Sequence, residues 1–168
     1  RDELRVQDIS SKIQLKFPRI QLQCVEIEQE VILLHLYIPP DTSHSMRKRI
    51  WDRIHDLLIT DELKDKTIIT GDLNTLDRRC GASHKENHPY LNTVLYPIGP
   101  LRIISDRNKP TREDHTLDVT LATKTAKNAV TNWRALNRLA SDHLPAIFDL
   151  RINTQPVPKI DYQRSTYR

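Results

Sequence analysis

The 168-residue sequence has few cysteines, glycines and aromatic residues, and it contains no long hydrophobic run. Its longest apolar stretch, residues 31–38, is interrupted by His35 and is far too short to span a bilayer. The two cysteines, Cys24 and Cys80, show no spacing typical of a metal site or of a disulfide framework. These absences exclude a disulfide-stapled scaffold and a transmembrane helix, and they favour free thiols in a reducing compartment.

Length and composition indicate one globular domain. A chain of this length can bury a core that is stable without a disulfide or a structural metal. Its net charge of +4 and pI of about 9.1 permit an anionic partner such as nucleic acid, although many basic proteins bind none. Because the sequence opens with Arg1-Asp2 and not with methionine, we expect a piece of a longer polypeptide.

The first half of the sequence predicts a hairpin followed by a helix. Two extended runs, 22–27 and 31–38, flank the polar residues 28–30, a pattern typical of antiparallel strands. Ser43 is the predicted N-cap of a helix. Apolar residues recur there at helical spacing: Met46, Ile50, Trp51, Ile54, Leu57 and Leu58.

The second half predicts several short strands. They are expected at 67–70, 101–104, 116–123, 130–136 and 146–152. A shorter helix is expected from Pro89 to just before Pro97. The mixture favours an α/β or α+β class with a largely antiparallel sheet, in a domain of residues 1–153 followed by a linker at 154–168.

Polar residues at a strand end are the first candidates for chemistry. Asp72 and Asn74 follow the strand at 67–70, and Gly71 allows a sharp exit. Two residues apart on an extended stretch, their side chains are expected to point the same way. The carboxylate can take a proton from water, and the carboxamide can donate hydrogen bonds to an anion. Taken alone, the segment is more often an ordinary turn.

Three other segments have comparable potential. Asp142 and His143 precede the last strand and offer a metal ligand and a proton donor or phosphate ligand, with a capped turn as the alternative. Asp118 lies on the polar side of an apolar strand, so it is either buried beside a partner such as histidine or exposed at an edge. Tyr37 ends a strand, where core packing is the more common role.

In this order, the segments containing Tyr37, Asp72, Asp118 and Asp142 resemble the motifs of the endonuclease/exonuclease/phosphatase superfamily. Within it, the chain is most similar to the apurinic-endonuclease-like domain of jockey-type retrotransposons, which lack long terminal repeats. Residues 116–122 and Trp133 carry this narrower likeness. The resemblance implies part of a four-layered α/β sandwich of the deoxyribonuclease-like type, with its N-terminal strands absent.

The resemblance also implies roles for individual residues. Asp72 would orient or deprotonate the attacking water, and Asn74 would bind the scissile phosphate. His143, held in its tautomer by Asp118, would stabilise the transition state, and the Tyr37 hydroxyl would reach the phosphate.

A cofactor and partners follow from the same likeness. Asp142 would help to bind Mg²⁺, with Mn²⁺ as a substitute. The reaction would be DNA nicking inside the cell, in the nucleus, to supply a primer end for a covalently attached reverse transcriptase, with no membrane involved. Apart from the likeness, four basic residues fall in predicted loops from which they could contact DNA phosphates, although a solvated surface position is the more common role of any one of them: Arg78, Arg79, Lys109 and Arg112.

One departure from the family pattern keeps other functions open. Family members carry an N-terminal Asn and a metal-ligating Glu, and neither can be placed here, because the sequence upstream of Leu22 is too short and has the wrong pattern. Glu3 and Glu26 do not lie in that motif. A phosphatase on the same scaffold and a catalytically inactive remnant that binds nucleic acid by charge alone are therefore the alternatives.

Overall fold

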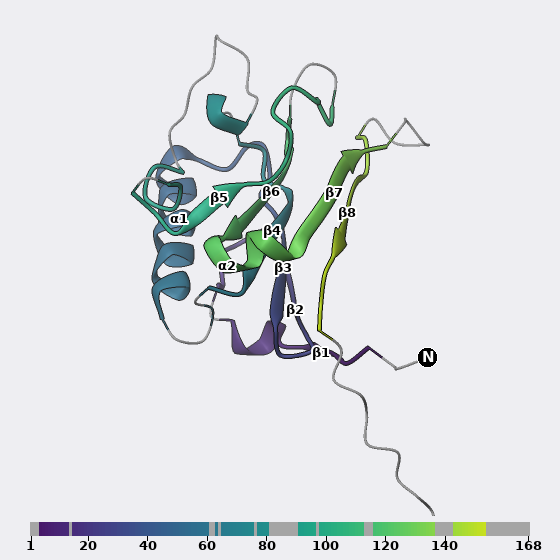
Figure 1. Cartoon of the computed structure of the whole chain (residues 1–168). Coiled ribbons are helices and arrows are strands. Elements are labelled where there is room, and N and C mark those ends of the chain that lie inside the picture. Colours follow the sequence, from purple (N-terminus) through teal and green to yellow (C-terminus); the bar gives the residue numbers. More distant parts are fainter. Residues whose placement is uncertain are drawn as a thin grey trace, which may run out of the picture.

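A six-stranded sheet lies at the centre of the molecule, between a long helix and a two-stranded sheet (Figure 1). The computed structural model describes residues 4–13, 15–60, 63, 65–75, 77–80, 91–96, 98–112, 116–136 and 143–153. Within these ranges, no helix has the length and apolar character needed to cross a membrane. The arrangement confirms the predicted mixed α/β class.

The large sheet has the strand order β1-β2-β3-β4-β6-β5. Its strands are β1 Val6–Asp8, β2 Gln21–Ile27, β3 Val31–Tyr37, β4 Thr67–Asp72, β5 Leu101–Ile103 and β6 Asp118–Thr123. Among the described strands, β3 and β4 pair in parallel and all other neighbours are antiparallel. The second sheet pairs β7 Val130–Ala135 with β8 Ala146–Leu150. The predicted, largely antiparallel character is thus confirmed.

The hairpin and the long helix form where the sequence predicts them. β2 and β3 pair along their whole length, and the chain reverses through Glu28 and Gln29, which both have positive φ. Helix α1 spans His44–Ile59, and the Ser43 hydroxyl caps it by accepting a hydrogen bond from the Met46 N–H at 3.3 Å.

Each face of the large sheet has its own core. Ile32, Leu34 and Leu36 of β3 belong to the cluster that includes Trp51 of α1. On the opposite face, a smaller cluster joins Val31, Ile68 and Ala122 to Phe148 and Leu150 of β8. Because side chains alternate along a strand, one strand can serve both cores.

Cys24 and Cys80 are buried free thiols, as expected from the sequence. Burial raises the pKa of Cys24 to about 11 and that of Cys80 to about 12. Both side chains therefore remain neutral near pH 7 and contribute to packing.

Some local structure differs from the prediction. The described part of the expected second helix, residues 91–96, forms hydrogen-bonded turns, because the backbone of Val94 and Tyr96 pairs with Leu101. Pro89 lies outside the described residues. Four elements were not predicted: β1, helix α2 at Lys124–Ala129 and short 3-10 turns at Ser10–Lys12 and Arg78–Cys80.

Replacement of Gly71 should strain the sheet beside the end of β4. Gly71 has a φ of 132°, and an added Cβ would collide with the carbonyl oxygen of Leu36. We expect Gly71→Ala to lower the free energy of unfolding by at least about 1 kcal/mol in a urea titration. The exposed replacement Thr125→Ala on α2 is the control, with an expected change below about 0.5 kcal/mol. Equal stability of the two variants would contradict the strain at Gly71.

Candidate active site

The sheet register brings Tyr37, Asp72 and Asp118 to one row at one end of the sheet. Asp72 and Asp118 are direct partners across β4 and β6. On the other side of β4, His35 pairs with Thr70, so the parallel register continued by two residues brings Tyr37 level with Asp72. The Ile38 N–H donates to the Asp72 carbonyl at 3.0 Å, which holds the ends of β3 and β4 together.

A hydrogen bond between His143 and Asp118 links the two sheets at this end. The distance from His143 Nδ1 to Asp118 Oδ2 is 2.7 Å, and both side chains are about three-quarters buried. Because a carboxylate can only accept, Nδ1 carries the proton. Because Nδ1 is bonded to Asp118, proton exchange or donation to an anion would involve the other ring nitrogen, Nε2.

Asn74 does not continue the extended strand, contrary to the reasoning from sequence. β4 ends at Asp72, and Asn74 has a positive φ of 41°, which asparagine tolerates better than most residues. Its backbone N–H donates to Asp72 Oδ1 at 3.1 Å, and its side-chain Nδ2 donates to the Ile38 carbonyl at 3.0 Å. The amide is therefore fixed beside Asp72 by a turn.

Burial changes the acidity of Asp72. Desolvation of the half-buried carboxyl raises its pKa above the usual value, and the negative charge of Asp118 acts in the same direction. Hydrogen bonds from Asn74 and the positive charge of a protonated His143 oppose the rise in this pKa. A carboxylate with a raised pKa is a better proton acceptor than an exposed one.

Two threonine hydroxyls and an indole lie beside the Asp72–Asp118 pair on the same two strands and on β7. Thr70 and Thr120 pair across β4 and β6, and their hydroxyls are 3.1 Å apart. Trp133 of β7 donates its indole N–H to Thr120 Oγ1 at 3.1 Å. Trp133, which carried part of the family likeness, thus anchors the second sheet to the first.

Arg47 is a supporting residue that the sequence reasoning did not identify. Its side chain is buried, and its guanidinium donates to five carbonyl oxygens at 2.8–3.2 Å. These acceptors belong to Pro39, Pro40, Thr42, Leu73 and Asn74. Arg47 thereby ties the segment after Tyr37 to the segment after Asp72. The available signal was a charged residue within the apolar stripe of α1, three positions before Ile50.

The remaining predicted site residues are Asp142 and four basic residues. Asp142 lies outside the described residues, and Arg78 lies in a 3-10 turn. Arg79 forms a two-pronged ion pair with the buried Asp77, so its first role is structural. Lys109 is exposed and Arg112 half-exposed in the β5–β6 segment, which leads into Asp118.

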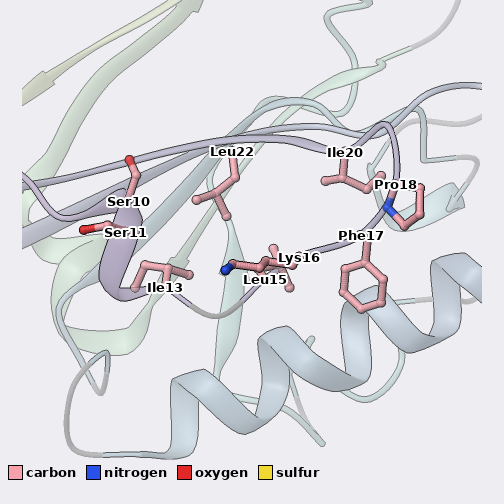
Figure 2. Close-up of a pocket in the computed structure, with 9 residues that line it drawn as sticks. All are labelled: Ser10, Ser11, Ile13, Leu15, Lys16, Phe17, Pro18, Ile20 and Leu22. Carbon is pink, nitrogen blue, oxygen red and sulfur yellow. The ribbon is translucent and has the colours of Figure 1, made fainter.

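A separate hollow of about 570 Å³ is lined by residues of the 10–22 segment (Figure 2). Its apolar lining includes Ile13 and Leu15, which belong to the core on the α1 side of the sheet. The Ser10 hydroxyl oxygen accepts the Cys24 N–H at 2.8 Å and so serves the fold. The hollow is therefore separate from His143 and Asp118, which do not line it.

Comparison with known proteins identifies the family. Residues 31–147 match the model of the endonuclease-reverse transcriptase family, which covers more than half of the chain. The chain belongs to this family. The predicted membership in the endonuclease/exonuclease/phosphatase superfamily is thereby confirmed. No match was found among curated proteins.

Solved structures show the same fold at low sequence identity. The endonuclease domain of TRAS1, a telomere-specific non-LTR retrotransposon, matches with a TM-score of 0.68 and 20% identity, over 90% of this chain and 70% of that one. The 3'-5' exonuclease NExo from Neisseria meningitidis matches with a TM-score of 0.59 and 14% identity, over 88% and 71%. A second NExo structure, described as a 3' phosphatase bound to product DNA hairpin, matches at 0.54 and 14%, over 90% and 73%. The expected deoxyribonuclease-like fold is thus confirmed.

The raised pKa of Asp72 predicts a pH-dependent effect on stability. The folded state binds the Asp72 proton more tightly than the unfolded state, so this contribution is fully present below the unfolded pKa. It is lost as the pH rises through the raised folded pKa. Asp72→Asn, which keeps the shape without the charge, should therefore be more stable than the parent chain at about pH 7, measured by urea titration with a chelator.

At about pH 4 the advantage of Asp72→Asn should shrink, because the parent carboxyl is then increasingly protonated. Asp56→Asn, at an exposed position of α1, is the matched control and should change stability little at either pH. A destabilised Asp72→Asn at neutral pH would show that its hydrogen bonds with Asn74 outweigh desolvation.

Loss of the Arg47 guanidinium should destabilise the segments around the site. Arg47→Met keeps much of the side-chain volume but leaves buried carbonyls without a donor, so we expect a loss of about 2–3 kcal/mol in unfolding free energy. Arg49→Met makes the same change at an exposed position of α1 and should cost less than about 0.5 kcal/mol. Similar losses in both variants, measured by urea titration, would refute the special role of Arg47.

Proposed function

We propose that this chain is a metal-dependent DNA endonuclease that hydrolyses phosphodiester bonds during retrotransposition. The observation that carries the proposal is the His143–Asp118 hydrogen bond beside Asp72, at one end of the central sheet. Asp72 would act as the general base, His143 as an oriented imidazole and Asn74 as an amide donor toward a phosphate bound at this end of the sheet. Membership in the endonuclease-reverse transcriptase family supports the choice of DNA over a small phosphate ester.

In this proposal, Asp72 takes a proton from the attacking water as the water oxygen bonds to phosphorus. The bond between phosphorus and the 3' oxygen breaks, and the 3' oxygen gains a proton from solvent. His143 Nε2 donates to the phosphoryl oxygens as their charge grows, while Asp118 holds the ring and stabilises its protonated form. Asn74 and Tyr37 bind the phosphate from the β4 and β3 sides.

The carboxylates at this end of the sheet are of the kind that binds a hard cation, since Mg²⁺ and Mn²⁺ prefer carboxylate oxygens. Asp72 and Asp118 have other roles in this proposal, as the general base and as the partner of His143. In the part of the chain that the structure describes, no group of three or more His, Cys, Asp or Glu side chains is arranged so that it could hold a metal ion. We therefore propose that Asp142, outside that part, completes the site. A bound Mg²⁺ would neutralise charge on the phosphate.

Further parts of the proposal concern the biological setting. The 3' hydroxyl left by cutting would prime a reverse transcriptase attached through residues 154–168, with residues 1–153 as the endonuclease domain. Lys109 and Arg112 would contact DNA phosphates near Asp118, together with Arg78 and, more weakly, the paired Arg79. Such a reaction would take place in the nucleus.

The proposed function predicts metal-dependent nicking of supercoiled plasmid. The parent chain should convert supercoiled to open-circular DNA with Mg²⁺ or Mn²⁺ and should not do so with a chelator. His143→Ala should reduce the rate by at least about 100-fold, because the developing charge loses its donor. His55→Ala, at a partly exposed position of α1, is the matched control and should retain the parent rate.

Other outcomes would select the alternative functions. Release of phosphate from a 3'-phosphorylated DNA hairpin, without plasmid nicking, would identify a phosphatase on the same scaffold. Salt-sensitive DNA binding by a folded chain, without either reaction, would identify a catalytically inactive remnant. Nicking that persists in His143→Ala at the parent rate would remove this site from the mechanism.

A further inference from the structure

Thr111 lies in the segment between β5 and β6, and its side chain is completely buried. Its neighbours Lys109 and Arg112 are exposed and half-exposed, so burial singles it out within the segment. The sequence offered no reason to select it, because a threonine between polar residues and a proline is typical of many loops. Its hydrogen bonds reach toward both members of the His143–Asp118 pair.

The hydroxyl of Thr111 holds the start of β6. Its Oγ1 accepts the Leu117 N–H at 3.0 Å and the Asp118 N–H at 2.9 Å. A hydroxyl oxygen has two lone pairs, so both acceptor positions are used. The two bonds fix the backbone from which the Asp118 carboxylate extends.

The backbone carbonyl of Thr111 holds the other side of the pair. It accepts the Leu144 N–H at 2.6 Å, and Leu144 directly follows His143. Beyond Leu144, the Pro145 carbonyl accepts the Leu136 N–H at 2.9 Å, which connects the same segment to the end of β7. One buried residue is thus bonded to the backbone at Asp118 and next to His143.

We propose that Thr111 is a positioning residue that sets the distance and angle between the Asp118 carboxylate and the His143 imidazole. The proposal rests on the function proposed above, since it concerns the same reaction. A carboxylate orients an imidazole only over a narrow range of distance and angle, and small displacements of catalytic groups are costly. Thr111 contacts neither water nor phosphate in this scheme and acts through the pair.

The threonine side chain suits this task for two reasons. Its hydroxyl supplies the two acceptor positions, and its β-branched carbon restricts rotation about χ1, so the oxygen stays aimed at the two N–H groups. Valine keeps the branched shape without the acceptor, whereas serine keeps the acceptor with a freer rotation. The two replacements therefore separate the hydrogen bonds from the packing.

Thr123 provides a matched control at the opposite end of β6. It is also buried, and its hydroxyl oxygen accepts a backbone N–H, that of Thr67, at 3.2 Å. Thr123→Val makes the same chemical change and leaves the same kind of group without a partner. It should lower stability without moving Asp118 relative to His143.

The test compares Thr111→Val, Thr111→Ser and Thr123→Val in plasmid nicking, at a temperature where each is folded. We expect Thr111→Val to lower kcat by at least about 10-fold with KM nearly unchanged, and Thr111→Ser to stay within about threefold of the parent chain. Thr123→Val should keep the parent kcat. In the background of His143→Ala, Thr111→Val should cause no further loss, because the pair it positions is already broken.

Two results would overturn the proposal. One is a parent-like kcat in Thr111→Val, and the other is an equal loss from Thr111→Val with or without His143. If Thr111→Val does not fold, Thr111→Cys replaces it and is compared with Thr111→Ser, since these two differ only in the thiol, which is a weaker acceptor than the hydroxyl.

A direct measurement separates this proposal from the proposed function. The proton between His143 Nδ1 and Asp118 should give a downfield NMR resonance, absent from His143→Ala. Thr111→Val should shift or broaden this resonance, and Thr123→Val should not. A parent chain that does not nick DNA would refute the endonuclease, whereas an unchanged resonance in Thr111→Val would refute the positioning role.

Discussion

The hydrogen bond between His143 and Asp118 connects the large sheet to the segment that leads into the small sheet. Asp118 opens a strand of the large sheet, and His143 precedes the strand β8 of the small one. The bond can form only when both sheets are packed in register, because an imidazole and a carboxylate tolerate little displacement. The distance between His143 Nδ1 and Asp118 Oδ2 therefore depends on how the two sheets pack against each other.

Buried polar groups around this bond form hydrogen bonds that fix the positions of the neighbouring segments. Arg47 donates hydrogen bonds to backbone carbonyls of the segments after β3 and after β4. The Thr120 hydroxyl lies within hydrogen-bonding distance of both Thr70 and Trp133. Such groups would be costly to bury unpaired, so each fixes its neighbours in the one arrangement that satisfies it. Desolvation of the half-buried Asp72 raises the pKa of its carboxyl within this frame, a kind of shift that is frequent at functional sites.

The sequence predicted the parts of the molecule that depend on regular patterns. The hairpin, helix α1 and the strands with alternating apolar residues came from periodicity, and the family likeness grouped Tyr37, Asp72, Asp118 and His143 in advance. Short or irregular elements were missed, because β1 is three exposed residues and α2 lacks an apolar stripe. The turn at Asn74 and the contacts of Thr111 depend on residues distant in sequence, which no local pattern encodes.

The pairing of β4 with β6 has a consequence for the order in which the molecule can assemble. During synthesis, the hairpin of β2 and β3 and the helix α1 emerge before β4 and can fold on local contacts. The partner of β4 arrives only after the long segment between Asp72 and Asp118, and His143 later still. A growing chain therefore carries the scaffold of the site well before it carries the site. The arrangement of His143, Asp118 and Asp72 can therefore form only after the chain has been made as far as His143.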